Sequence, residues 1–122
     1  MANGPLRTLV AIGSTTAPCA VGTVANPVTT IFVLPIREPA VLGRLFFNTD
    51  TVISPIENFQ VSNIVHNNIS YCTGATPASV YQADAIGSPR FGIPVSVNDQ
   101  LQVEVQAVGA ASLGTQVAFS VL

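Results

Sequence analysis

The sequence predicts an all-β protein: an eight-stranded antiparallel sandwich, jelly-roll-like, with at most one short helix. Nine Gly and nine Pro divide the 122 residues into short segments, which suit strands of about five or six residues better than helices of average length. The chain also contains 37 Val, Ile and Thr residues, whose branched side chains favour strands. Many short strands separated by turn residues are typical of sandwiches.

The residues from Gln100 to Ala107 form the clearest predicted strand. Leu101, Val103 and Val105 alternate there with polar side chains, so one face should meet a core and the other water or a partner. Turn clusters such as Asn67-Asn68 separate the segments. Seven further strands are expected at Leu6–Ile12, Val28–Leu34, Val41–Phe47, Phe59–Val65, Ile69–Cys72, Ile93–Val97 and Gln116–Val121.

A chain of this length is expected to form one domain over residues 1–122, with one core. The segment Ser14–Pro27 contains little bulk and is interpreted as an extended arm or long loop, so that residues 1–27 comprise this arm and the first strand. One short helix is expected in Thr76–Ala83, with Thr76 as the cap and Pro77 in the first turn.

Composition excludes several classes of protein. Apolar residues make up 48% of the chain, charged residues only 8%, and the mean hydropathy is +0.53, the reverse of a disordered chain. The longest apolar runs are far short of the roughly 20 residues of a membrane-spanning helix. No secretory signal follows Met1, so we expect synthesis in the cytoplasm. A net charge of −2 with four Arg and no Lys argues against direct nucleic-acid binding.

The sequence offers no constellation that predicts catalysis, a metal or a cofactor. The single histidine, His66, is interpreted as a turn or surface residue, because no other metal ligand is near it in sequence. The carboxylates occur singly, and a nucleophile elbow and a phosphate-binding glycine loop are absent. In a reducing compartment, Cys19 and Cys72 are expected to be buried thiols. We therefore expect a protein that is not an enzyme.

The surface of such a chain must consist largely of uncharged side chains, which suits contact with other proteins. We expect a symmetric homo-oligomer, with a trimer favoured over larger arrays. Arginine is the cation enriched at interfaces, so the candidate interface residues are Arg7, Arg37, Arg44 and Arg90.

The pattern of residues 56–122 resembles that of a known group of proteins. Its motifs are Ile56-Glu57-Asn58-Phe59-Gln60-Val61, the alternating stretch Gly92–Val105 and Val117-Ala118-Phe119-Ser120-Val121. They resemble small β-sandwich virion proteins of bacteriophages, which include jelly-roll coat and penton proteins and trimeric cement or decoration proteins. Sugar-binding modules and tumour-necrosis-factor-like trimers share the pattern.

The resemblance implies a structural virion protein located in the capsid, with capsid shell proteins as partners. A cement or decoration role is favoured, because the chain lacks the basic arm of a coat that condenses RNA. A coat or penton subunit is the first alternative. A carbohydrate-binding or adhesive module is the second, although sugar platforms use exposed aromatic rings and the chain has no Trp and only Tyr71 and Tyr81.

Overall fold

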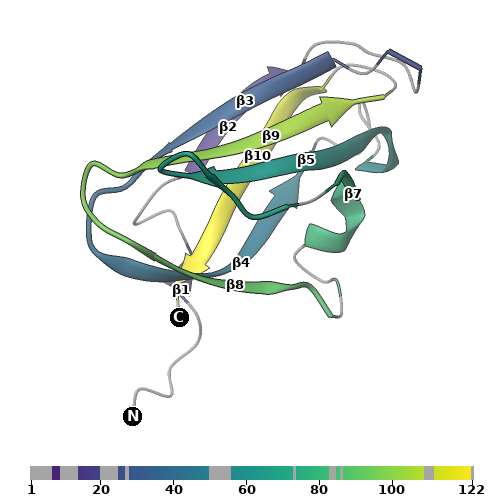
Figure 1. Cartoon of the computed structure of the whole chain (residues 1–122). Coiled ribbons are helices and arrows are strands. Elements are labelled where there is room, and N and C mark those ends of the chain that lie inside the picture. Colours follow the sequence, from purple (N-terminus) through teal and green to yellow (C-terminus); the bar gives the residue numbers. More distant parts are fainter. Residues whose placement is uncertain are drawn as a thin grey trace.

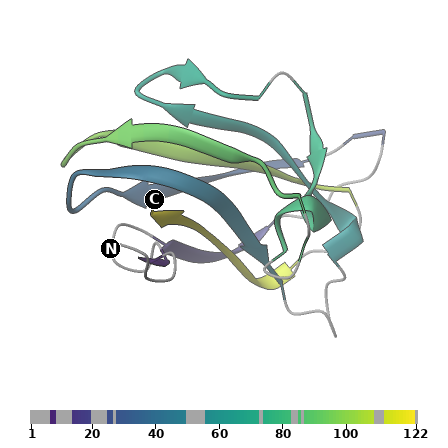
Figure 2. The same ribbon diagram turned by 90° about the horizontal axis from the view of Figure 1, so that it is seen from below.

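The protein is a sandwich of two antiparallel sheets. The computed structural model describes residues 7–8, 14–19, 25–26, 28–49, 56–72, 74–82, 85, 87–108 and 112–121, and only the backbone of residues 7–8, 14–19 and 112–114. Within these residues the strands of one sheet cross those of the other (Figure 1). Figure 2 shows the sandwich from below, with the teal β5–β6 hairpin on one side and yellow β10 on the other. The predicted all-β sandwich is confirmed.

Each sheet contains five strands among the described residues. Sheet A consists of β1 (Arg7–Thr8), β2 (Ser14–Cys19), β4 (Ala40–Asn48), β8 (Arg90–Val95) and β10 (Ser112–Val121). Sheet B consists of β3 (Val28–Pro35), β5 (Phe59–His66), β6 (Ile69–Ser70), β7 (Thr76–Pro77) and β9 (Gln100–Ala107). The edges of sheet B are β3 on one side and the short β6 and β7 on the other.

The strand pairs nest inside one another about a single turn at Asn67–Asn68. Val65 pairs with Ser70 close to this turn. Val28 and Ala107, which also pair, lie at equal distances along the sequence before and after the turn. Strands β4 and β8, and strands β2 and β10, pair in the same nested way. The chain is therefore one long hairpin, rolled so that β4 also pairs with β10 and β5 with β9. This nested order over eight strands is that of a jelly roll.

Both residues of the central turn have left-handed backbones, with φ of 48° at Asn67 and 68° at Asn68. His66 and Ile69 pair directly on either side, so the loop has two residues. Positive φ at both loop positions is the property of the type I′ turn, which matches the twist of the strands. Asn is one of the few residues with a side chain that adopts this conformation at low cost.

Asn68→Val is expected to lower the free energy of unfolding by about 1–2 kcal/mol, because a branched side chain clashes with the backbone at positive φ. Asn68→Gly is expected to keep the stability of the parent protein within about 0.5 kcal/mol. Urea denaturation measures both. Equal midpoints for the two variants would show that the left-handed backbone does not govern this position.

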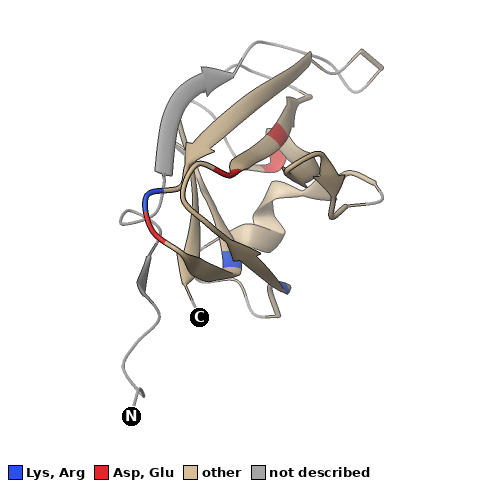
Figure 3. Ribbon diagram, turned by 60° about the vertical axis from the view of Figure 1, so that its left-hand side comes forward, with Lys and Arg blue, Asp and Glu red and all other residues tan. Residues whose placement is uncertain are grey.

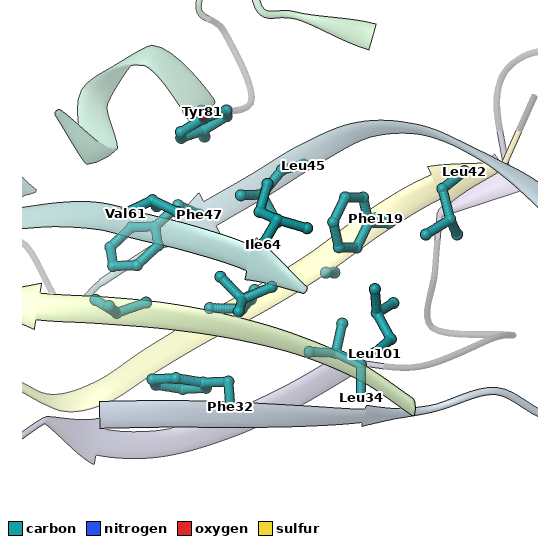
Figure 4. Packing of buried hydrophobic residues seen from close by; sticks show 14 of the residues in the cluster. Phe32, Leu34, Leu42, Leu45, Phe47, Val61, Ile64, Tyr81, Leu101 and Phe119 are labelled. Carbon is teal, nitrogen blue, oxygen red and sulfur yellow. The ribbon is translucent and has the colours of Figure 1, made fainter. Parts of the chain in front are cut away.

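The core lies between the sheets, and Figure 4 shows its side chains converging from strands of both. The four inward residues of β9, from Leu101 to Ala107, are fully buried, which confirms the predicted alternation. Phe47 of β4 contacts Phe59 of β5 with ring centroids 5.9 Å apart. The largest buried side chains are Tyr81, Phe47, Phe59, Phe119, Leu34, Leu42, Leu45, Ile64, Ile93 and Leu101.

The interpretation of Ser14–Pro27 as an arm or loop is corrected for Ser14–Cys19, which form β2 and pair with β10. Backbone hydrogen bonds to a neighbouring strand do not require bulky alternating side chains. The small residues of this segment therefore gave no sequence signal for the strand. In the predicted strand Leu6–Ile12, β1 covers Arg7–Thr8, and the remaining residues lie outside the described part of the chain.

The predicted helix is a single 3₁₀ turn, η2 (Ala78–Tyr81). Thr76 does not cap it, because Thr76 belongs to β7 and pairs with Val61 of β5. Pro77 occupies the cap position and makes no side-chain hydrogen bond to the turn. A second 3₁₀ turn, η1 (Ile56–Asn58), precedes β5, so the described residues contain two short turns of helix where at most one is predicted.

Candidate functional site

The outer face of sheet B is formed by the outward side chains of β3, β9 and β5. Gln60 Nε2 donates a hydrogen bond to Gln106 Oε1 over 2.6 Å, and Gln106 Nε2 donates to Thr29 Oγ1 over 3.3 Å. This row crosses three strands at matching register positions. Glu104 is the only Asp, Glu, Lys or Arg in the five strands of sheet B, and Figure 3 shows how few charged residues the strands carry. The face is polar but almost uncharged.

One edge of this face is strand β3. We call its outward side chains, Thr29, Ile31, Val33 and Pro35, together with the backbone side that faces away from β9, the β3 edge. Ile31 is 54% exposed and Val33 59% exposed. Among the described residues, β9 is the only strand that pairs with β3. Within the described residues, the side of this eight-residue strand that faces away from β9 pairs with no other strand, and two branched apolar side chains are exposed.

The other edges differ in ways that discourage pairing. Edge strand β8 of sheet A begins with the exposed Arg90, contains Gly92 at φ 63° and has Pro94, which lacks an N–H. Charge, distorted backbone and proline are the usual means by which proteins protect sheet edges. Strands β6 and β7 have two residues each. The β3 edge is the long edge with described side chains that carries neither charge nor distortion, and its proline, Pro35, is the last residue of the strand.

No known protein family, curated protein or solved structure matches this chain. The site is therefore interpreted from its own residues. Within the described part of the chain, no helix has the length and apolar character needed to cross a membrane.

The structure brings two of the four candidate arginines, Arg44 and Arg90, opposite each other and places Arg7 and Arg37 in other segments. Arg7 lies in β1, and its side chain is outside the described part. Arg37 follows β3 and is exposed, as is Arg90 at the start of β8. Arg44 of β4 is opposite Arg90 in the β4–β8 pair. Arg44 and Arg90 thus belong to sheet A, whereas the β3 edge belongs to sheet B. The prediction that the four arginines lie in an interface stays a prediction.

Arg44 makes contacts within its own chain. Its Nη2 donates hydrogen bonds to the carbonyl oxygen of Gln82 over 2.8 Å and to Ser88 Oγ over 3.0 Å. Its guanidinium lies 4.5 Å from the centre of the Phe46 ring, a cation–π distance. This half-buried arginine therefore holds the segment after η2 against β4.

His66 is buried, and its interpretation as a turn or surface residue is wrong. Its Nε2 lies 2.8 Å from Asp99 Oδ2, which also accepts a hydrogen bond from the Ser96 N–H over 2.8 Å. Asn67 Oδ1 accepts from the Gln100 N–H over 2.8 Å, and the Asn67 N–H donates to the Gln100 carbonyl. The tip of the β5–β6 hairpin is thus tied to the turn between β8 and β9. Sequence reasoning missed this because the partners are about 30 residues apart.

The His66 ring and the Ser96 N–H lower the pKa of Asp99. A lowered folded-state pKa means that ionised Asp99 stabilises the fold above the ordinary Asp pKa of about 4, and that this contribution is lost as the pH falls further. Asp99→Asn is therefore expected to reduce the loss of stability below about pH 4, measured by urea denaturation across pH. Glu57→Gln, at an exposed carboxylate of η1, is the control. Equal pH dependence in the parent and the Asp99 variant would contradict this role.

The remaining chemistry-bearing residues do not converge in the described residues, where no group of three metal-ligating side chains occurs. Cys72 is free and half-buried, and burial raises the pKa of its thiol. Asp50 and Asp84 lie outside the described residues. Of the eight aromatic side chains, only Tyr71 is exposed, at 39%, whereas Tyr81 is buried and stacks on Phe91 with ring centroids 6.5 Å apart.

The most informative residues of the site, Ile31 and Val33, were not candidates in the sequence. The run Ile31–Leu34 is continuously apolar, a pattern that fits a strand buried on both faces. Only Phe32 and Leu34 are buried. The sequence offers one signal for such an edge. It is a strand in a charge-poor chain that has no charged residue and no alternation of apolar and polar residues.

Proposed function

We propose that the protein is a structural component of a virion, a cement or decoration protein that assembles as a symmetric homo-oligomer on a capsid shell. The observation that carries this proposal is the β3 edge. A long, uncharged strand with exposed apolar side chains is a hazard for an isolated domain but a suitable contact for one that works in an assembly.

Two further features support the proposal. The jelly-roll strand order is a frequent architecture of capsid proteins, a fold-level analogy that adds weight without deciding function. The outer face of sheet B carries glutamine and threonine side chains hydrogen-bonded to each other, together with a single carboxylate, Glu104. Depletion of charge is the compositional property of interface centres.

The main alternative from another class is a carbohydrate-binding or adhesive module. Sugar platforms need exposed aromatic rings, and the fold buries Tyr81 and all or part of each Phe side chain. Tyr71 alone remains for this role. These observations favour the assembly proposal over the sugar-binding one.

The experiment that tests the proposal has two parts. Light scattering on the purified protein at micromolar concentration is expected to give the mass of an oligomer, and a stable monomer would contradict homo-oligomeric assembly. Sedimentation with phage shells that lack their cement protein is expected to carry the protein into the pellet. Failure to sediment with any shell would contradict the cement role, and closed shells formed by the protein alone would favour a coat subunit.

A further inference from the structure

We propose that β3 pairs antiparallel with β3 of a second copy of this chain, about a two-fold axis at Phe32, and so joins the two B sheets into one continuous sheet. This inference rests on the proposed function, because it names the contact through which the chain assembles. The partner at the β3 edge is a second copy of this chain rather than a different protein. The reason is that the edge carries no charged residue.

In a two-fold contact the residues near the axis lie close to the same residues of the other copy, so any charge at the centre of the contact would face a like charge. Strand β3 has no charged residue. The nearest charge on the outer face is Glu104, which pairs with Ile31 from the next strand inward. The two Glu104 side chains would be three strand spacings apart, about 14 Å, beyond the Debye length of about 8 Å at physiological ionic strength. The edge can therefore pair with itself without repulsion.

The alternation of β3 limits the register of this pairing. Directly opposed residues of an antiparallel pair point to the same face, and Ile31 and Val33 point outward while Phe32 and Leu34 point into the core. An axis at Phe32 sets Ile31 of each copy opposite Val33 of the other. The two most exposed side chains of the strand then cover each other as branched cross-strand pairs, which are favourable in sheets.

An axis at Ile31 also keeps the faces aligned, but it sets Val33 opposite Thr29. This register leaves the more exposed of the two apolar residues against a hydroxyl. An axis at Val33 sets Ile31 opposite Pro35, which has no N–H to donate to a paired strand. The register at Phe32 is the one that sets the two exposed branched residues, Ile31 and Val33, opposite each other.

The first test is the mass of the free protein by sedimentation equilibrium. The parent protein is expected to have the mass of two chains. Ile31→Lys and Val33→Lys each place like charges within the paired strands and are expected to weaken association by about tenfold or more. Val97→Lys is the matched control, because Val97 is a similarly exposed valine, at 47%, in the turn after β8. It is expected to leave the mass unchanged.

The outcomes separate this contact from the proposed function. A parent oligomer that both lysine variants leave intact, or a parent mass of three chains, would overturn the two-fold β3 contact and keep homo-oligomeric assembly. A monomeric parent protein would overturn both the two-fold β3 contact and the homo-oligomeric assembly of the proposed function. Circular dichroism of the variants must match that of the parent, which the exposure of Ile31 and Val33 leads us to expect.

A second measurement tests the register without charged substitutions. In a Cys19→Ala, Cys72→Ala background, Ile31→Cys copies mixed with Val33→Cys copies are expected to give more disulfide-linked dimer on oxidation than either variant alone. Opposed residues in a strand pair are within disulfide reach, and diagonal ones are farther apart. Highest yield for Ile31→Cys alone or for Val33→Cys alone would overturn the register at Phe32, and no crosslink in any mixture would overturn the pairing.

Discussion

Val103→Asp is expected to unfold the protein. Val103 is fully buried at the centre of β9, between β3 and β5, where it pairs with Phe32 and Ile64. A carboxylate there would lose its hydration without gaining a partner, at a cost of several kcal/mol. Since a domain of this size has a total stability of about 5–15 kcal/mol, the folded state should be largely lost. Circular dichroism at 25 °C and a thermal scan measure this result.

Gln102→Ala is the control, because Gln102 is the neighbouring residue on the opposite face of the same strand. Its side chain is half-exposed on the outer face of sheet B, so its truncation is expected to change the free energy of unfolding by no more than about 0.5 kcal/mol. Equal melting temperatures for Val103→Asp and Gln102→Ala would show that the assignment of the two faces of β9 is wrong.

Phe119→Ala is expected to lower the free energy of unfolding by about 3–5 kcal/mol, the usual cost of removing a buried phenylalanine ring. Phe119 of β10 is fully buried. Its ring meets that of Phe91 edge to face, with centroids 6.1 Å apart, and Phe91 in turn stacks on Tyr81. Loss of the Phe119 ring therefore opens a cavity and removes the support of this aromatic series. Urea denaturation with a constant m-value measures the difference.

Phe46→Ala provides the comparison for Phe119→Ala. Phe46 belongs to β4, which pairs with β10, but its ring is half-exposed beneath the Arg44 guanidinium. Its removal leaves no closed cavity, so a smaller loss of stability is expected. A loss as large as that of Phe119→Ala would contradict the assignment of Phe119 to the core and of Phe46 to the outer face.

The local signals in the sequence were sufficient for much of the fold. Alternation in Gln100–Ala107 predicts both the strand and its buried face, because period-two burial is a property of a few consecutive residues. Asn67-Asn68 predicts a turn because asparagine tolerates the left-handed backbone that a two-residue hairpin needs. These features are encoded next to each other in the chain.

Other features depend on residues that only the fold brings together. Ser14–Cys19 form strand β2 because they lie beside β10. No property of these small residues predicts that β10 is their neighbour. Thr76 has the residue type of a helix cap, yet pairing with Val61 keeps it in a strand. His66, at the end of β5, is buried and lies 2.8 Å from Asp99, which belongs to the turn between β8 and β9. Tertiary contacts override local preference at each of these positions.

The candidate site was predictable only in outline. The low charge content predicts a contact surface. Nothing in the sequence predicts the position that we propose for it at β3, because a strand buried on both faces and an exposed apolar edge have similar compositions. The arginine content predicts an interface role for Arg44, but in the fold its side chain donates hydrogen bonds to Gln82 and Ser88 of its own chain.

The rolled hairpin has a consequence for how the chain folds. Pairing of β5 with β6 closes a two-residue turn, whereas pairing of Val28 with Ala107 closes almost the whole central part of the chain. The entropy of closing a loop must be lost before its contacts form, and β proteins dominated by such non-local pairs fold in roughly milliseconds to seconds. During that time β3 is not yet paired with β9, its partner far along the chain. The backbone groups of β3 that β9 later covers are therefore still exposed. The strand that we assign to assembly can thus also pair too early with another incompletely folded chain.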